Sequence, residues 1–200
     1  MIIDSCLTYE EATRDNPKVE PAPLFVRKYL RLIKVWYYSY DGEIHEGQLV
    51  VHRHIRPQVK AIFGELLRHR IPIAKVVPIV SYEWDDERSM QDNATSCYNW
   101  RTIPGTDRLS LHALGLAIDI NPLWNPWIKG ELVQPAGARY DPSVPGTLTA
   151  NSLIVQIFKK YGFDWAGDWY QEHGLVDYQH FGFLPRLADP LLYLREHNLM

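Results

Sequence analysis

The sequence contains only two cysteines in 200 residues, Cys6 and Cys97. They do not form a Cys-x-x-Cys pair, which excludes a cysteine-based zinc site, and two cysteines do not make a disulfide framework. Long apolar runs are also absent, since no stretch approaches the roughly 20 residues that cross a bilayer. The sequence therefore predicts no integral membrane segment. The opening residues, Met-Ile-Ile-Asp-Ser-Cys, show neither the basic nor the apolar part of a signal peptide.

Excess charge of either sign is missing as well. The chain has 21 Lys and Arg against 24 Asp and Glu, a formal net charge of -3. This balance gives no electrostatic argument for nucleic acid as a partner. The hydrophobic fraction of 46% supports a sizeable core, and the length fits one domain. We expect residues 1–30 to form an N-terminal extension or arm, residues 31–200 to form the domain, and the protein to be a monomer.

The pattern of apolar residues predicts both helices and strands. The β-rich run that starts at Val35 meets Asp41-Gly42, a strong signal for a hairpin. Apolar stripes with helical spacing, followed by Pro72 and Gly162, predict two amphipathic helices. The expected elements are strands at 31–40, 44–54 and 73–82, helices at 56–69, 151–161 and 190–197, and a long irregular segment at 121–149 that walls a cleft.

Two histidines share one face of the second hairpin strand. His52 and His54 are separated by one residue, so they point the same way in a strand. No carboxylate lies near them in the sequence. We therefore expect them to be surface or groove residues rather than metal ligands.

The most informative block is Ser110-Leu-His112-Ala-Leu-Gly115-Leu-Ala-Ile-Asp119. Aliphatic residues alternate between 116 and 120, which predicts a strand that buries its aliphatic face and places Asp119 on the opposite face. Gly115 suits a tight entry or a close backbone approach just before this strand. His112 lies outside the alternation, so we place it on the preceding loop, curling back toward Asp119.

A second block, Asp177-Tyr-Gln-His180-Phe, follows about sixty residues later. Alternation from 178 to 183 predicts a strand with Tyr178, His180 and Gly182 on one face, preceded by Asp177. A lone histidine is usually a core or surface residue, and a carboxylate at a strand end is usually a cap or an ion-pair partner. The combined pattern instead favours a catalytic zinc site, which takes three protein ligands and leaves a position for water. His112, Asp119 and His180 would be its ligands.

Asp177 is then a spare carboxylate next to the ligands. A carboxylate beside a zinc site can take the proton of the attacking water. We therefore predict that Asp177 is the catalytic base.

These two blocks resemble the zinc D-alanyl-D-alanine carboxypeptidase family, which includes VanY-like and VanX-like peptidases and the L-alanyl-D-glutamate endopeptidases of phage endolysins. Every fixed position of the first block is present. VanX-like members have Glu at the position of Asp177, whereas the endolysin-type branch resembles this chain in using Asp. The stretch 163–169 looks like that branch's Trp-Gly-Gly-Asp-Trp segment, with Ala166 in place of one Gly. Residues 92–101 look like the family's Asn-Thr-Ser-x-Phe-Asn-x-Arg segment, and the resemblance covers roughly residues 45–185.

The resemblance implies an α+β fold of the hedgehog and D-Ala-D-Ala peptidase kind, with helices packed on a mostly antiparallel central sheet. It implies one Zn²⁺ per chain and cleavage of peptidoglycan stem peptides. Arg101 would hold an oxyanion or a substrate carboxylate. Ser110 and Ser96 would bind substrate, with loop capping as the alternative. Trp169 and Trp165 would wall the pocket that binds substrate, with core packing as the alternative. Asp168 would orient a ligand histidine or cap a turn, and His173 is expected at the surface.

The specificity stays open between carboxypeptidase, dipeptidase and endopeptidase. The stretch 163–169 favours the endopeptidase, whereas 93–96 and 118–122 look more like carboxypeptidases. An inactive zinc-containing binding module of the hedgehog kind is the alternative from another class, and Asp177 argues against it. The family implies the cell envelope, periplasm or extracellular space, while the missing signal peptide leaves the cytoplasm open.

Overall fold

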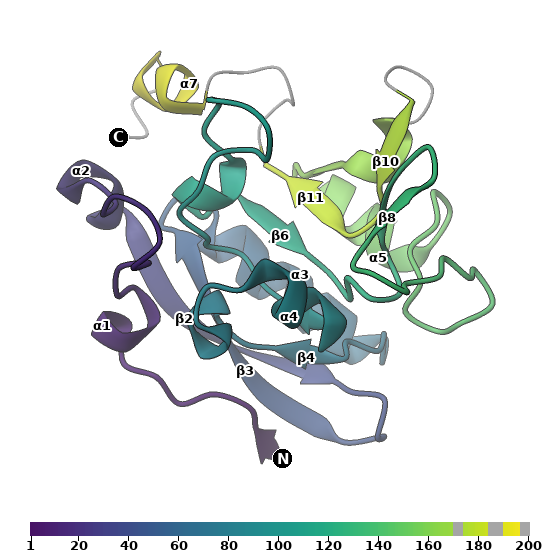
Figure 1. Ribbon diagram of the computed structural model, residues 1–200. Helices are drawn as coiled ribbons and strands as arrows, with labels where there is room; N and C mark the ends of the chain where they lie inside the picture. Colours follow the sequence, from purple (N-terminus) through teal and green to yellow (C-terminus); the bar gives the residue numbers. More distant parts are fainter. Residues whose placement is uncertain (170–173, 184–189, 197–200) are drawn as a thin grey trace.

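The computed structural model describes residues 1–169, 174–183 and 190–196 and has a mixed α+β architecture (Figure 1). Its described strands form three three-stranded sheets and one two-stranded sheet. Most strand pairs are antiparallel, and only the pairs β1–β3 and β4–β5 are parallel. The predicted fold class is confirmed. In the part of the chain that the structure describes, no helix has the length and apolar character needed to cross a membrane.

The hairpin predicted from Asp41-Gly42 is confirmed. Strand β2 (Leu30–Tyr38) pairs antiparallel with β3 (Ile44–His52) along their whole lengths. Gly42 has a φ of 85°, a left-handed conformation that glycine adopts without steric cost. Helix α3 (Arg56–Arg68) is the amphipathic helix predicted there, and it packs against β2 of the hairpin. Its buried residues are Val59, Ile62, Phe63 and Leu66.

The N-terminal segment lies against this hairpin. Strand β1 (Ile2–Ile3) pairs parallel with β3, so the sheet order is β1-β3-β2. Two short helices follow, α1 (Tyr9–Ala12) and α2 (Leu24–Arg27). Helix α1 begins with a capping box in which Thr8 and Glu11 satisfy each other's backbone N–H groups. The division at residue 30 stays a prediction.

The strand predicted over 73–82 is wrong for most of its length. Only β4 (Lys75–Val76) is extended, and the 3₁₀ helix η1 (Ile79–Tyr82) begins directly after Pro78. A proline has no N–H to donate, so it interrupts a strand ladder and suits the start of a helix. Helix α4 (Asp86–Gln91), which we did not predict, follows, and the Asp85 carboxylate caps it. Strand β5 (Ala94–Thr95) then pairs parallel with β4.

The second half of the chain builds the sheet of order β6-β11-β9. These strands are β6 (Ala117–Asp119), β11 (His180–Gly182) and β9 (Asp164–Trp165). Helix α5 (Leu153–Lys160) lies within the predicted range, and Phe158 stacks on Phe181 of β11 with ring centroids 4.0 Å apart. The C-terminal helix α7 (Pro190–Glu196) also agrees with its prediction.

The segment 121–149 is less irregular than expected. It contains β7 (Trp127–Lys129) and β8 (Leu132–Gln134), a hairpin whose turn has Gly130 at a φ of 58°. Strand β10 (Leu175–Asp177) pairs with β7. Asp177 therefore ends one strand, and residues 178–179 form a turn before β11. The predicted strand from Tyr178 was wrong at its start, because the alternation continues across this turn.

One core joins both halves of the molecule. Buried side chains from β2, β3, α3, β6, α5 and β11 form a single cluster. Figure 1 shows β6 between the hairpin β2–β3 and the β10–β11 region. The three alternating residues Leu116, Ile118 and Ile120 are fully buried in this core. Because β6 is fixed at the centre, the polar end of this strand has a defined position.

The expectation for His52 is also corrected. This residue is 2% exposed, and its ring stacks on Tyr29 with centroids 5.4 Å apart. It is buried because the end of β3 packs against the loop at Gly115. The Gly115 carbonyl accepts a hydrogen bond from the His52 N–H at 2.8 Å. His54 is half-buried and meets Phe183 edge-on.

Candidate metal centre

His112 lies in the short 3₁₀ helix η2 (Leu111–Leu114) rather than in an extended loop. Ser110 caps this helix, since its hydroxyl accepts a hydrogen bond from the His112 N–H at 3.2 Å. Serine is a preferred residue at this position because its oxygen satisfies an otherwise unpaired N–H group. The structure therefore shows Ser110 as a cap, and its predicted role in substrate binding is untested.

Gly115 ends η2 in a conformation that only glycine adopts easily. Its φ is 65°, and a Cβ atom there would lie 2.7 Å from the backbone nitrogen of His52. The close approach predicted for this position is present. It links the loop of His112 to the end of β3.

Asp119 is the last residue of β6, and two neighbouring segments hold its backbone. Ser96 exchanges both backbone hydrogen bonds with Asp119, at 3.2 and 3.0 Å. On the other side, His180 is the direct partner of Asp119 in the β6–β11 ladder. Antiparallel partners present their side chains on the same face, so this register brings the two side chains together.

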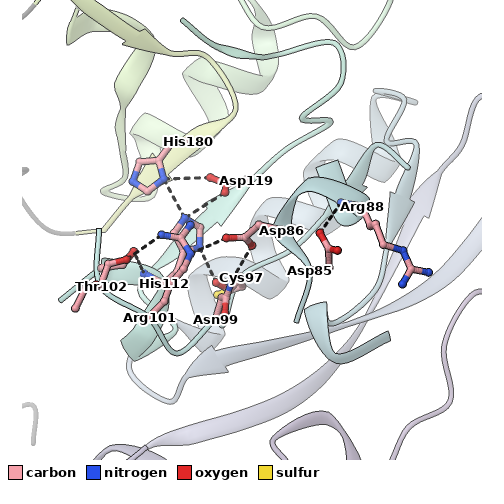
Figure 2. Close-up of polar contacts among 11 residues, drawn as sticks. Asp85, Asp86, Arg88, Cys97, Asn99, Arg101, Thr102, His112, Asp119 and His180 are labelled. Atoms are coloured by element: carbon pink, nitrogen blue, oxygen red, sulfur yellow. Dashed lines mark hydrogen bonds and ion pairs between the residues drawn. The ribbon is translucent and has the colours of Figure 1, made fainter. Parts of the chain in front are cut away.

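The side chains of His112, Asp119 and His180 converge on one point (Figure 2). The His112 Nε2 lies 3.1 Å from His180 Nδ1 and 3.2 Å from Asp119 Oδ2, and His180 Nδ1 lies 3.1 Å from Asp119 Oδ1. One ligand atom of each residue lies within 4.8 Å of the others. The two sequence blocks are thus brought together as predicted, and their roles as ligands stay a prediction.

The donor set fits a divalent metal of the zinc type. Two imidazoles and one carboxylate are common zinc ligands. His112 Nδ1 lies 2.6 Å from the carbonyl oxygen of Cys97. The Nδ1–H group therefore donates to this carbonyl, which leaves the Nε2 lone pair directed at the other two residues. This is the orientation that metal-binding histidines usually have.

The electrostatic environment of Asp119 also favours the binding of a cation. Burial alone would raise the pKa of its carboxyl group, but His112 and His180 beside it hold the pKa well below its usual range. The Asp119 carboxylate is therefore ionised and available to a cation at neutral pH.

Asp177 ends β10, three residues before His180. Its Oδ1 is buried and has no hydrogen-bond partner among the described residues. Burial, reinforced by the charge of Asp119 and opposed by His180, raises the pKa of this carboxyl group to about 7. A carboxylate with a pKa near neutrality, next to three candidate ligands, is poised to exchange protons.

Arg101 is held by one ion pair and one hydrogen bond. Its Nε lies 2.8 Å from Asp86 Oδ2 of α4, and one terminal nitrogen donates to the Thr102 carbonyl at 3.3 Å. Asp86 also accepts a hydrogen bond from the Asn99 side chain at 2.7 Å, which fixes the carboxylate that holds Arg101 (Figure 2). The positive charge of Arg101 lowers the pKa of Asp177. Its predicted contact with substrate is untested.

Trp169 lies beside the cluster. It ends the 3₁₀ helix η3 (Ala166–Trp169), and its ring centroid is 5.7 Å from that of His180. Trp165 packs in the core instead, where its indole N–H donates to the Tyr178 carbonyl at 2.8 Å. Asp168 forms an ion pair with Lys159 at 2.6 Å, and both roles predicted for it stay predictions. His173 lies outside the described residues.

Sequence reasoning missed two partners of the site. The Cys97 carbonyl orients His112, and Asp86 orients Arg101. The first is a backbone group, which no residue type identifies in advance. Asp86 lies in a helix that was not predicted, so its nearness to Arg101 had no signal in the sequence.

Comparison with known proteins identifies one related family. Residues 104–183 match the model of the D-alanyl-D-alanine carboxypeptidase family. No curated protein and no solved structure matches the chain. The matched segment includes His112, Asp119, Asp177 and His180, whereas Ser96 and Arg101 precede it. Over residues 104–183, this match supports the family suspected from the two sequence blocks, that of the D-alanyl-D-alanine carboxypeptidases.

Proposed function

We propose that this protein is a zinc-dependent peptidase that cleaves peptidoglycan stem peptides. The family match supports a hydrolase of peptide bonds that acts on peptidoglycan. The observation that carries the proposal is the convergence of His112, Asp119 and His180. The buried Asp177 carboxylate interacts electrostatically with Asp119 and His180, and its Oδ1 has no hydrogen-bond partner among the described residues. We further propose that it acts in the cell envelope, where peptidoglycan lies.

His112 Nε2, His180 Nδ1 and an Asp119 oxygen would hold one zinc ion. When bound there, zinc polarises the scissile carbonyl and makes a water molecule more acidic. The Cys97 carbonyl keeps His112 in the tautomer that presents Nε2. The ionised Asp119 supplies the negative charge that a divalent cation requires in a buried site.

Asp177 would act as the general base. Its carboxylate removes a proton from the attacking water and then delivers that proton to the nitrogen of the leaving amine. Proton transfer is efficient when the pKa of the base lies near the working pH. The raised pKa of Asp177 meets this condition.

Arg101 would bind negative charge on the substrate. The ion pair with Asp86 and the hydrogen bond to the Thr102 carbonyl restrict the orientation of the guanidinium before substrate arrives. A guanidinium of fixed orientation can contact a carboxylate or an oxyanion through two parallel hydrogen bonds.

The test is hydrolysis of synthetic stem peptides, followed by mass spectrometry. A pentapeptide ending in D-Ala-D-Ala reports carboxypeptidase activity by loss of one alanine, and the free dipeptide D-Ala-D-Ala reports dipeptidase activity. A peptide with an L-Ala-γ-D-Glu bond reports endopeptidase activity. Cleavage of any one supports the proposal and identifies the bond. A zinc-loaded protein that cleaves none of them would instead be a binding module of the hedgehog kind.

A further inference from the structure

The turn at residues 178–179 connects the candidate base to one of the candidate ligands. Asp177 lies immediately before this turn and His180 immediately after it. The position of the candidate base relative to the candidate ligands therefore depends on how firmly the turn is held. The first residue of this turn is Tyr178.

The Tyr178 ring meets the Trp165 ring at a centroid distance of 6.0 Å, and three closer contacts hold Tyr178 in place. Its N–H donates to the Pro126 carbonyl at 3.3 Å, and its carbonyl accepts a hydrogen bond from the Trp165 indole at 2.8 Å. The third contact is with Tyr140, whose ring lies parallel to that of Tyr178 at 4° with centroids 3.7 Å apart. The first two contacts fix the backbone, and the ring stack fixes the side chain.

Tyr140 is itself anchored, although it lies in a stretch without helix or strand. Its hydroxyl donates to the Leu148 carbonyl at 2.6 Å. The Leu148 N–H in turn donates to the side chain of Asn125 at 2.7 Å, and both of these residues are fully buried. An irregular segment thus presents one rigid aromatic face to the turn beside Asp177.

We propose that Tyr140 is a positioning residue, whose ring stacks on Tyr178 and sets Asp177 against the cluster of His112, Asp119 and His180. This inference rests on the proposed function, because it assigns Tyr140 a part in the same reaction. Tyr140 acts through Tyr178 and is not itself a catalytic residue. Small displacements of a catalytic group cost much rate, since about 1 Å of misplacement lowers it by roughly 100-fold.

The experiment compares three variants for kcat, KM, zinc content and melting temperature. Tyr140→Leu removes the ring, and Tyr140→Phe keeps it. Tyr40→Leu is the matched control, because Tyr40 packs on Trp124 and donates to the Pro145 carbonyl, so it anchors the same irregular segment without stacking on Tyr178. We expect Tyr140→Leu to lower kcat by about 10- to 100-fold with KM and zinc content nearly unchanged. Tyr140→Phe keeps the ring but loses the hydrogen bond to the Leu148 carbonyl, so its loss of kcat should be clearly smaller than that of Tyr140→Leu. Tyr40→Leu should stay within about threefold of the wild type.

A double substitution tests whether Tyr140 acts through Tyr178. Tyr140→Leu should cause no further loss of kcat in a Tyr178→Leu background, because the stack is already gone. Hydrogen exchange of the metal-free protein gives a readout independent of activity, and residues 175–182 should exchange faster in Tyr140→Leu than in Tyr140→Phe. If Tyr140→Leu does not fold, Tyr140→His, with a smaller flat ring, replaces it and should give an intermediate kcat.

Three outcomes would overturn the inference. They are a wild-type kcat in Tyr140→Leu or its replacement, an equal loss in Tyr140→Phe, and an equal loss in Tyr40→Leu. A wild-type protein without hydrolysis would contradict the proposed function instead, so the two failures are distinguishable.

Discussion

Replacing Asp177 by asparagine should separate chemistry from metal binding. The amide has the shape of the carboxylate but cannot accept the proton of the attacking water. Loss of a general base lowers the rate by about 10²–10⁴-fold, which equals roughly 3–5 kcal/mol of transition-state stabilisation. Because Asp177 is not one of the three converging ligands, Asp177→Asn should keep its zinc.

The same substitution should stabilise the metal-free protein at alkaline pH. The folded pKa of Asp177 is about 7 against an ordinary value of 3.8, so the folded state disfavours the charged carboxylate. This penalty is absent below pH 4, grows as the pH rises, and is complete above pH 7. The difference between the two pKa values corresponds to about 4 kcal/mol as an upper limit. Asp177→Asn removes the charge, so its advantage in unfolding free energy should appear at pH 8 and disappear near pH 4.

Chemical denaturation of both proteins after chelation, at pH 4 and pH 8, measures the stability difference. Stem-peptide turnover and zinc analysis complete the test. Wild-type turnover in Asp177→Asn would remove this residue from the mechanism, and loss of zinc would make it a ligand. A variant that is less stable than the wild type at pH 8 would refute the argument from burial.

Three further predictions concern neighbouring residues. Arg101→Lys keeps the charge but not the planar group held by Asp86, so kcat/KM should fall at least tenfold while the melting temperature stays within a few degrees; unchanged kinetics would make Arg101 structural. Gly115→Ala should lower both stability and zinc content, because its φ is 65° and its Cβ would meet the His52 backbone, and thermal melts with metal analysis check this. Burial, helped by His54 and Arg53, lowers the pKa of His52 to about 4. The unfolding free energy should therefore be highest above pH 6.5 and fall by up to about 3 kcal/mol as the pH drops from 6.5 through 4. In denaturant titrations, His52→Phe should lose less unfolding free energy on acidification than the wild type.

Local sequence signals predicted the elements that have strong periodicity. Asp41-Gly42 identified the hairpin, and the stripes of α3 and α5 identified both helices, because side-chain spacing alone determines which face is buried. The strand predicted over 73–82 is wrong because Pro78 interrupts its apolar run. The hairpin β7–β8 has a signal, since Gly130 lies between two short apolar runs, but the many prolines and glycines of that segment favour irregular structure.

The candidate site was predicted as a set of side chains but not as a geometry. His112, Asp119 and His180 were identified because their residue types match zinc chemistry, and the pairing of His180 with Asp119 in the β6–β11 ladder brings them together. The supporting contacts depend on tertiary structure. The Cys97 carbonyl that orients His112 and the stack of Tyr140 on Tyr178 join segments that no local pattern connects.

The central claim is that His112, Asp119 and His180 hold a zinc ion. Metal analysis of the purified protein, after chelation and reconstitution with zinc, tests it most directly when His112→Ala and His180→Ala are measured in parallel. The account predicts close to one equivalent of zinc in the wild type, less than about a tenth of this in each variant, and a zinc-dependent rise in melting temperature for the wild type alone. A reconstituted wild-type protein without zinc, or variants that retain a full equivalent, would contradict it.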